Sequence, residues 1–520
     1  MHHRILLSLI LCLGFTIGAP VFASSSKLVG SKLAFKQYNI TAPFKVILPV
    51  IPLDLVIEDE SAVDEIVVIG DDESDQTWLA VYVFDKKTND FILLDKMVLS
   101  DEYFAFDVSE DLEGLYFLAK NKVMSLKYND PLKEENSLQP GLTLQHEQDV
   151  DSIFLINESS FITKKDFIQD INKDGLDDII LPDFEQTNLW LSSKNKQTYV
   201  YQHIAINTKV ELSRGGVNFS PIPLFYADFN LDSRQDIAWI SKGSINYFSQ
   251  TEAGTFSEQE QSITLADTIH GLNWWQIRES DGQSPDQSNL THRVVEQVKD
   301  INGDGLVDTI VRYTQSSGVL DRANNYEFYM GYINQNKRLA YPEKPDTAIE
   351  AEGTLTGLKI IDVNNDNKFE VLLSSFELSI SNIIGALLAG GIDQNVLLFA
   401  LDDDNKYEDD AVISKEVELN FSLSSGQSGQ PIVLLSDVNG DELQDLVLSL
   451  DEEKLAIFLG KNTSGLFNRK ASKHKILLPK NGELFEHHDL NQDGKEDFIM
   501  RYGRLDDESL ANKVTILMVK

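Results

Sequence analysis

Cysteine is almost absent from this sequence of 520 residues. The single cysteine, Cys12, lies near the N-terminus inside an apolar run. A chain with one cysteine cannot close a disulfide within itself, and removal of the N-terminal segment would leave no thiol chemistry. Any stabilisation of the loops must therefore come from interactions other than disulfides.

Basic residues are scarce as well. Lys and Arg number 45 against 83 Asp and Glu, which gives a formal net charge of −38 at pH 7. An acid excess of this size disfavours nucleic acid and anionic membranes as partners and favours cations. Hydrophobic residues make up 42% of the chain, which is typical of a globular protein.

Long hydrophobic runs are also missing. The longest candidate, residues 5–18, follows the basic start His2, His3 and Arg4 and precedes small residues that end at Ala23. This order predicts a signal peptide over residues 1–23, cleaved after Ala23, and hence export to the periplasm, the cell surface or the medium. A membrane anchor is the alternative, but the run is shorter than the roughly 20 residues that a spanning helix needs. A lipid anchor on Cys12 is disfavoured because no small residues precede that cysteine.

What the sequence does contain is a nine-residue loop that recurs six times, with first residues spaced by 58, 72, 62, 75 and 52 residues. Such a period with uneven insertions indicates stacked supersecondary units. Positions 1, 3, 5, 7 and 9 of the loops are Asp170, Asn172, Asp174, Leu176 and Asp178; Asp228, Asn230, Asp232, Arg234 and Asp236; Asp300, Asn302, Asp304, Leu306 and Asp308; Asp362, Asn364, Asp366, Lys368 and Glu370; Asp437, Asn439, Asp441, Leu443 and Asp445; Asp489, Asn491, Asp493, Lys495 and Asp497.

The flanks of these loops predict short strands. An apolar stretch precedes each loop, a β-rich run follows it, and two more short strands usually come next, as at residues 244–248 and 454–458. Four strands per unit predict an all-β fold, a single β-propeller over residues 24–520.

Two further units are expected upstream. Asp107, Ser109, Asp111 and Glu113 keep the spacing of the loop, but Leu115 replaces the closing acid. Further upstream, strands at residues 53–57 and 66–69 are expected to bracket an acidic loop without the motif. The count is then eight blades, two of them metal-free, and seven remains the alternative if residues 53–99 pack otherwise.

The two ends of the chain predict how the ring closes. After the last loop only residues 498–501 and 514–519 form strands, so the final blade lacks its outermost strand. The N-terminal strand at residues 33–40 has no unit of its own. We expect it to complete the final blade, since closure leaves only short, protected strand edges.

The donor set of the loop predicts calcium. Oxygens at positions 1, 3 and 5, a backbone carbonyl at 7 and a carboxylate at 9 suit a hard cation with six to eight ligands, and magnesium demands stricter geometry. Up to six Ca²⁺ are expected. Glycine at position 6 eases a positive φ, so the loops with Gly175, Gly305 and Gly494 should bind best; the others carry Ser233, Asn367 and Glu442 there.

Two other interpretations of the loop are possible. An EF-hand needs Glu at position 12 between helices, whereas here position 12 is Leu181, Val311, Leu448 or Met500 within an expected strand. Ordinary hairpin turns also use Asp, Asn and Gly. Six copies that all retain an acid at position 9 favour metal binding over turns alone.

The D-x-N-x-D-G-x-x-D loop between strands, repeated about every 60 residues, resembles FG-GAP/VCBS repeats, including those in the propeller of integrin α chains. The resemblance covers most of the chain after residue 23. It implies calcium-stiffened blades in an adhesion or ligand-binding protein, and in some members a propeller that bears an active site. The two upstream repeats lack the ligand set, so calcium is not carried over to them.

Three insertions are candidate functional segments. Trp274 and Trp275 could stack on sugar rings or anchor a protein partner, or one or both could pack between blades. The apolar residues 380–392 could form a docked amphipathic helix, a lipid-touching loop or a partner contact. The acidic run 402–410 is expected to be a solvated hairpin loop.

Catalytic motifs are lacking, with neither a Gly-rich phosphate loop nor a nucleophile elbow in the chain. His487 and His488 should face opposite sides of their strand. The leading hypothesis is a non-enzymatic scaffold that binds a protein or a glycan. The alternative is a carbohydrate-active enzyme, a polysaccharide lyase or a glycosidase, on the same propeller. Convergence of His, Arg, Lys and Tyr with carboxylates at the channel would favour the enzyme.

Overall fold

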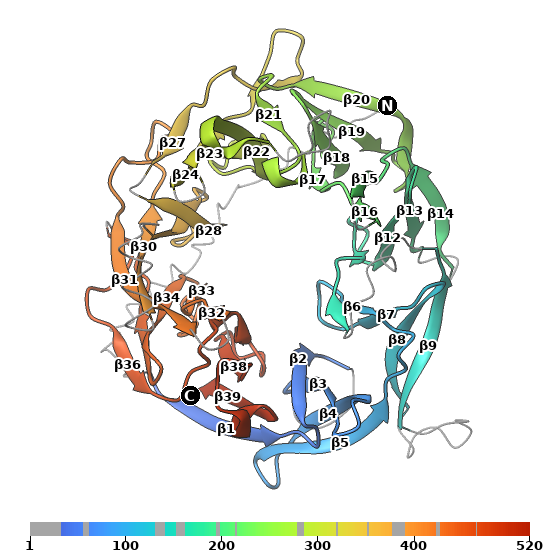
Figure 1. Ribbon diagram of the computed structural model, residues 1–520, viewed down its shortest axis with the longest axis vertical. Coiled ribbons are helices and arrows are strands. Elements are labelled where there is room, and N and C mark those ends of the chain that lie inside the picture. The colour runs from blue at the N-terminus through green and yellow to red at the C-terminus, as the bar shows by residue number, and fades with distance from the viewer. Residues whose placement is uncertain are drawn as a thin grey trace, which may run out of the picture.

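The strands of the protein are arranged as a ring, which the chain follows once around (Figure 1). The computed structural model describes residues 33–55, 62–129, 141–151, 162–193, 198–213, 216–277, 285–318, 321–350, 353–376, 391–422, 427–463 and 465–520. The predicted signal peptide, residues 1–23, lies outside the described residues.

The repeating unit is a four-stranded antiparallel sheet. In one unit β17 (Phe225–Ala227) lies innermost, followed outward by β18 (Asp236–Ser241), β19 (Ser244–Gln250) and β20 (Phe256–Thr264) (Figure 1). The nine-residue loop joins the innermost strand to the second strand. The second strand is almost wholly buried, which explains its continuous run of apolar residues.

The remaining sheets repeat this order from the inside outward. They are β2 (Val46–Leu53), β3 (Glu65–Asp71), β4 (Thr77–Asp85) and β5 (Asp90–Val98); β6 (Ala105–Val108), β7 (Leu115–Leu118), β8 (Lys122–Asn129) and β9 (Gly141–Asp149), with β10 (Thr163–Lys164) beside β6; β11 (Ile168–Gln169), β12 (Asp178–Pro182), β13 (Thr187–Leu191) and β14 (Val200–Ile204); β22 (Leu290–Lys299), β23 (Asp308–Gly318), β24 (Asp321–Tyr329) and β27 (Thr347–Ile349), with β21 (Ile269–His270) beside β22; β28 (Thr354–Ile361), β29 (Glu370–Phe376), β30 (Gly391–Phe399) and β31 (Ile413–Ser422), with β32 (Gln427–Gly429); β33 (Val433–Ser436), β34 (Asp445–Asp451), β35 (Lys454–Phe458) and β36 (Ser472–Lys475); and β37 (Phe485–His488), β38 (Asp497–Arg501), β39 (Lys513–Val519) and β1 (Phe35–Thr41).

The fold is therefore an all-β propeller, as predicted. One parallel bridge between Asn324 and Thr354 joins β24 to β28, so two of the expected blades form one continuous sheet. Antiparallel runs of four strands give eight units within the described residues, whereas continuous sheets of four or more strands give seven. The number of blades accordingly stays a prediction.

The N-terminal strand closes the ring. β1 pairs antiparallel with β39 over seven residue pairs, from Phe35 with Val519 to Thr41 with Lys513. Beyond them the backbone N–H of Lys520 donates to the carbonyl of Ala34 at 2.9 Å. The predicted closure is confirmed, with the strand beginning at Phe35 rather than at residue 33.

The predicted innermost strand of the first unit was wrong in its bounds. It runs over Val46–Leu53 and ends before Asp54 and Leu55, whereas residues 56 and 57 lie outside the described residues. Pro49 and Pro52 lie within it, and its register with β3 shifts between Ile47 and Val50. An innermost strand is a sheet edge, and an edge strand with a bulge tolerates proline because part of its backbone needs no partner in the sheet.

Apolar cores fill the spaces between neighbouring units. At the seam of the ring, Ile66, Val68 and Ala80 of the first unit pack with Ile499 and Ile516 of the last. Each fully buried Ile or Val contributes about 1.5–3 kcal/mol relative to exposure. The contact between units is therefore a packed core.

Short elements complete the structure. The hairpins β15 (Lys209–Ser213)–β16 (Gly216–Ser220) and β25 (Tyr332–Ile333)–β26 (Leu339–Ala340) form separate two-stranded sheets. The helical turns are η2 (Trp274–Gln276), η3 (Gln287–Asn289), η4 (Gly482–Leu484) and η5 (Glu508–Leu510). Among the described residues, no helix has the length and apolar character needed to cross a membrane.

Candidate functional site

All six motif loops fold as the same tight turn, seen most fully in the loop of residues 300–308. The Asp300 carboxylate accepts hydrogen bonds from the backbone N–H groups of Gly303 at 2.8 Å, Asp304 at 3.2 Å and Gly305 at 2.8 Å. The Asn302 side-chain oxygen accepts from the same Asp304 N–H at 3.0 Å. One N–H thus holds the oxygens of positions 1 and 3 next to each other.

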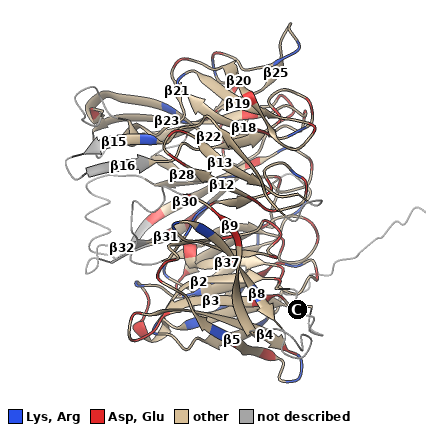
Figure 2. Ribbon diagram, turned by 90° about the vertical axis from the view of Figure 1, so that its right-hand side faces the viewer, with Lys and Arg blue, Asp and Glu red and all other residues tan. Residues whose placement is uncertain are grey.

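The pattern recurs in the other five loops. In each, the N–H of position 5 donates to positions 1 and 3, and the N–H of position 6 donates to position 1. Position 6 is left-handed whether or not it is glycine, with φ of 67° at Ser233, 64° at Asn367 and 67° at Glu442. Because all six turns connect innermost to second strands, they lie on the same face of the ring, where acidic residues recur in the loops (Figure 2).

The carboxylate of position 9 is buried in every motif loop. Asp308 is 0% exposed, and its two oxygens accept from the N–H groups of Ile301 at 3.0 Å and Gly331 at 2.8 Å. Burial, together with the nearby charges of Asp304 and Asp300, raises the pKa of Asp308 to about 7, although the two backbone hydrogen bonds act in the opposite direction. The equivalent Asp178, Asp236, Glu370, Asp445 and Asp497 also have their pKa raised to about 7, with burial as the main cause.

Glu370 serves as a longer version of the same group. Its Oε2 accepts from the N–H of Val363 at 2.9 Å, the equivalent of the bond from Ile301 to Asp308. The extra methylene of glutamate therefore leaves this backbone contact in place.

These donors suit a hard cation only as a mixed set. In the part of the chain that the structure describes, no three His, Cys, Asp or Glu side chains form a metal-binding group by themselves. A cation in the loop would rely on the Asn oxygen of position 3 and the carbonyl of position 7 besides the carboxylates. Calcium at the six loops stays a prediction.

Two loops place a cationic side chain on the position-5 carboxylate. The Arg234 guanidinium contacts Asp232 at 2.6 Å, and Lys495 Nζ contacts Asp493 at 3.3 Å. Both basic residues occupy position 7 of their loops, where only the backbone carbonyl was considered, as a calcium ligand. The sequence carried the signal, since a basic residue two positions after an acid in a tight turn can reach it. The Asp489 loop is therefore a weaker candidate than its glycine suggested.

The loop of residues 107–115, which we call the degenerate loop, keeps the turn but lacks the full set of acids. Ser109 Oγ donates to Asp111 Oδ1 at 2.6 Å and accepts from the N–H of Gly114 at 2.7 Å. The first residue, Asp107, points elsewhere and accepts from the N–H groups of Phe167 and Ile168 in the next unit, at 2.7 and 2.8 Å. Asp107 therefore links two neighbouring units through these hydrogen bonds, a contact that we call the Asp107 staple.

The tryptophan pair divides into one buried and one exposed ring. Trp274 is 7% exposed and lies 5.0 Å from the Arg322 guanidinium, whereas Trp275 is 44% exposed and lies 5.3 Å from that of Arg312. The two rings meet edge to face at 5.4 Å. Only Trp275 is therefore available to a ligand.

The other two insertions differ in how far the structure describes them. Residues 380–390 lie outside the described residues, and Gly391 begins β30. Residues 402–406 form a turn in which the Asp402 carboxylate accepts from the N–H groups of Asp404 and Lys406. The fully exposed Asp403 pairs with Lys368 at 2.6 Å, as suits a solvated loop.

A cavity of about 2090 Å³ lies where the first, second and last units meet. Its walls include residues of β2, β6, β10 and β37 and the residues after β38. Basic side chains from three units line it, namely Lys45, Lys164, Arg501 and Arg504, together with His487 and His488. The sequence could not show this convergence because the residues come from three separate regions of the chain, near residues 45, 164 and 487–504.

Glu486 is one of six acidic residues that line the cavity, the others being Asp71, Asp75, Asp101, Asp506 and Glu508. Its side chain is exposed to the cavity, yet the surrounding walls displace bulk water, and this burial raises the pKa of Glu486. The charges of Arg501, Lys164 and His487 act in the opposite direction. A carboxyl group whose pKa is raised inside a cavity is a candidate for proton transfer.

The adjacent histidines face different partners, as expected. His487 Nδ1 contacts Glu496 at 2.6 Å, and His488 Nε2 contacts Asp64 of the first unit at 2.7 Å. The second contact joins the last unit to the first across the seam. The two rings do not form a metal pair.

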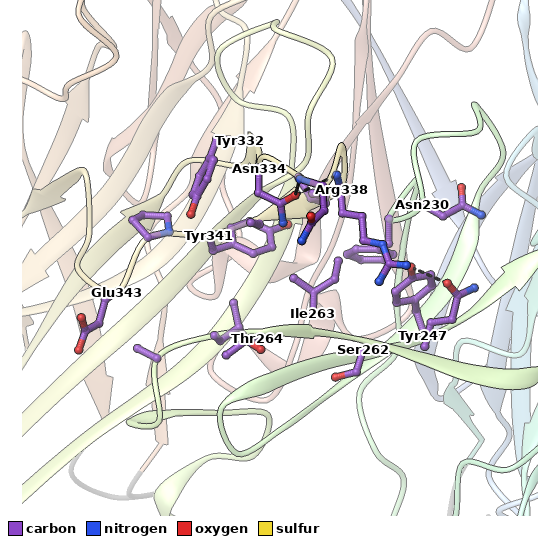
Figure 3. Close-up of a pocket in the computed structure, with 18 residues that line it drawn as sticks. Asn230, Tyr247, Ser262, Ile263, Thr264, Tyr332, Asn334, Arg338, Tyr341 and Glu343 are labelled. Atoms are coloured by element: carbon purple, nitrogen blue, oxygen red, sulfur yellow. Dashed lines mark hydrogen bonds between the residues drawn. The ribbon is translucent and has the colours of Figure 1, made fainter.

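A smaller cavity of about 660 Å³ lies between β20 and the β25–β26 hairpin (Figure 3). Tyr247 and Ile263 line one side, and Tyr332, Asn334 and Arg338 of the hairpin line the other. Sequence reasoning missed this hairpin, because nothing in its short strands indicated that it would fold back over the neighbouring unit.

Similarity to known proteins is limited to solved structures that share little sequence with this chain. No family model and no curated protein matches the chain. Among solved structures, a 6-phosphogluconolactonase-like protein of Bacteroides fragilis is 9% identical with TM-score 0.31, covering 83% of this chain and 95% of that one. The WD40 domain of SCAP from fission yeast is 11% identical with TM-score 0.33, covering 94% of each. At these TM-scores the fold assignment rests on the sheet topology described above.

Proposed function

We propose that the protein is an exported, calcium-binding propeller of the FG-GAP/VCBS type, which acts as a non-enzymatic scaffold for a protein or glycan ligand. The observation that carries the proposal is the recurrence of one hydrogen-bonded turn in all six motif loops, with oxygens of positions 1 and 3 on a shared N–H. Hairpin turns alone do not require an acid at position 9.

The buried third carboxylate supports a cation. Each motif loop brings a buried acid near two others, and burying a charge without compensation is costly. An ion of charge 2+ would relieve that cost, and a flexible shell of mixed oxygens suits Ca²⁺ better than Mg²⁺. The acidic chain would gain rigidity from such ions, in place of disulfides.

Metal analysis of the purified protein tests this proposal. Protein dialysed in excess calcium should retain several Ca²⁺ per chain, should lose them to chelator, and should regain its melting temperature with calcium but poorly with equimolar magnesium. A metal-free protein with the same melting curve would contradict the calcium assignment. Mass measurement of the protein recovered from outside the cytoplasm, with Ser24 first, would test export.

The scaffold role is tested by binding. A glycan array and a pull-down from extracellular proteins should each be probed with calcium-loaded protein, since calcium-stiffened blades are expected to present the ligand surface. Binding that disappears in chelator supports the proposal. A calcium-saturated protein that converts polysaccharide without retaining any ligand would overturn the non-enzymatic role.

A carbohydrate-active enzyme is the second candidate, and the large cavity favours it. His487, Arg501, Lys164 and Glu486 all line it, and side chains of these kinds can serve an acid–base reaction on a saccharide. Reducing ends and unsaturated uronate should be measured with acidic and neutral polysaccharides. Glu486→Gln should abolish turnover, while the control Glu483→Gln, a residue outside the cavity wall, should not. Equal rates in the two variants would contradict an active site there.

A further inference from the structure

The hairpin that covers the smaller cavity is held firmly in place. Its tip is a tight turn in which the Asn334 side-chain oxygen accepts from the N–H groups of Asn336 at 2.8 Å and Arg338 at 3.2 Å. At its base the N–H of Gly331 donates to Asp308 at 2.8 Å, and the Tyr341 hydroxyl donates to the carbonyl of Val307 at 2.8 Å. Both anchors belong to the motif loop that starts at Asp300.

The opposite wall belongs to another motif loop. Phe229 and Asn230, at positions 2 and 3 of the loop that starts at Asp228, line the cavity beside Tyr247. Gly331 explains the close approach of the hairpin, because a Cβ there would lie 2.5 Å from the Val307 carbonyl oxygen. The cavity is thus framed by two proposed calcium loops.

The lining combines aromatic faces with amide and hydroxyl groups. The rings of Tyr247, Tyr332 and Tyr341 face the cavity from two sides, and Tyr332 is 48% exposed (Figure 3). The Asn334 amide nitrogen donates to no other described residue, since only the oxygen of that side chain is engaged. A half-exposed ring beside free amide donors suits a pyranose, which has an apolar face and a hydroxyl edge.

Arg338 supplies the only cationic side chain of the lining. Its guanidinium extends into the cavity toward Tyr247, and it makes no hydrogen bond or ion pair with a described residue (Figure 3). The one acidic residue of the lining, Glu343, lies at the far end of the cavity. In a chain with 83 acids and 45 bases, an arginine without an acidic partner in a cavity points to an anion from outside.

We propose that this cavity binds an acidic sugar residue of a glycan, with the carboxylate on Arg338, the ring face on Tyr332 and the hydroxyls on the amides of the hairpin. The inference rests on the proposed function in its glycan form and names the ligand class. The volume of about 660 Å³ suits one or two sugar units. A single arginine matches one carboxylate per unit, whereas a densely charged phosphate chain would meet repulsion from a chain of net charge −38.

The test uses the full-length, calcium-loaded protein on an array of uronate- and sialate-bearing glycans, each paired with its carboxyl-methylated counterpart. Binding should be confined to the free acids. Arg338→Gln and Tyr332→Ala should each weaken it about tenfold or more, because a charge-assisted bond and a stacking surface are lost. Lys337→Gln is the matched control, since it removes one positive charge from the same hairpin outside the cavity lining, and it should bind normally.

Different results would contradict the acidic-sugar site and the proposed scaffold function. Equal binding of the methyl esters, equal binding of sulfated glycans, or normal binding by Arg338→Gln at an unchanged melting temperature would overturn the acidic-sugar site. Binding of a protein partner with no glycan bound would also overturn it, yet would leave the scaffold proposal standing. Loss of the calcium effect on stability would instead contradict the proposed function itself.

Discussion

The second unit of the ring and the six motif-bearing units hold the same turn by different means. In the loop of residues 300–308, Asp300 accepts from N–H groups of its own turn, and the buried Asp308 lies near it. In the loop of residues 107–115, the first acid leaves the turn for the next unit, and Leu115 replaces the last. Position 6 of this loop, Leu112, is still left-handed with φ of 60°. The turn is therefore a local property of the chain, and the grouped carboxylates are an addition to it.

That difference divides the ring into two arcs with different sources of stability. One arc runs from β2 to β10, and the other, the motif-bearing arc, runs from β11 to β39 and contains the six motif loops. The motif-bearing arc is expected to depend on cations, because its acids are grouped and partly buried. The arc from β2 to β10 depends on apolar packing and on the Asp107 staple. The closing strand β1 joins the ring at the boundary between the arcs, next to the unit that has no motif at all.

Removal of β1 should have the largest effect on the stability of the ring. A protein that begins at Ala42 would leave the edge of β39 bare and would open the seam between the two arcs. We expect aggregation or a far lower melting temperature than that of the protein beginning at Ser24. Size-exclusion chromatography and calorimetry measure both effects. A monomer with unaltered melting would show that β1 is dispensable for closure.

Calcium removal should have the next largest effect and should act on one arc. A site saturated at 100 times its Kd contributes about 2.7 kcal/mol to folding, so six sites would contribute several times that amount. Hydrogen exchange in chelator should rise first in the strands that flank the motif loops, such as β18 and β23. Equal acceleration in β3 and β7, which adjoin no motif loop, would contradict the division into arcs.

Single substitutions should separate a motif loop from the degenerate one. Asp304→Ala removes a position-5 oxygen and should cost one bound calcium and about 2–3 kcal/mol of the free energy of unfolding. Asp111→Ala should leave the calcium count unchanged, because its loop has no closing acid. Both counts come from elemental analysis of dialysed protein. The same calcium loss in both variants would remove the distinction.

The Asp107 staple should contribute to the free energy of unfolding even when calcium is removed. Asp107→Ala leaves the N–H groups of Phe167 and Ile168 buried without an acceptor, which should cost about 1–3 kcal/mol. Asp107→Asn keeps an acceptor oxygen and should cost less. Urea unfolding in chelator is the measurement, since any calcium contribution is then absent. An Ala variant as stable as the native protein would show that the two N–H groups find other acceptors.

The smallest effects concern position 6. Gly305 has φ of 83°, and a Cβ there would touch nothing within 4 Å, so Gly305→Ala measures backbone strain alone and should cost about 1 kcal/mol. Glu442→Gly relieves φ of 67° and should stabilise by about 0.5 kcal/mol. Opposite signs in thermal unfolding are expected. A shift of the same sign in both would show that position 6 is not under backbone strain.

Much of the fold could be predicted from local signals. Each motif loop is flanked by β-rich residues, and the unmatched strands at the two ends predicted the pairing of β1 with β39. The innermost strand β2 could not be predicted, because Pro49 and Pro52 argue against a strand and only its edge position tolerates them. The six turns were predicted from their spacing. The pairing of Arg234 with Asp232 was not predicted, because position 7 was considered only for its backbone carbonyl.

By itself, the sequence determined the repeat, the turn and the closing strand, because each depends on residues close together in the chain or on a count of strands. Only the tertiary structure decided which residues share a cavity. Arg338 faces Tyr247 because the β25–β26 hairpin folds over the neighbouring unit, and Glu486 lies near Lys164 because the closed ring brings distant units together. The sequence records strand patterns between neighbours, whereas cavities arise from loops of different units whose orientation depends on the packed ring.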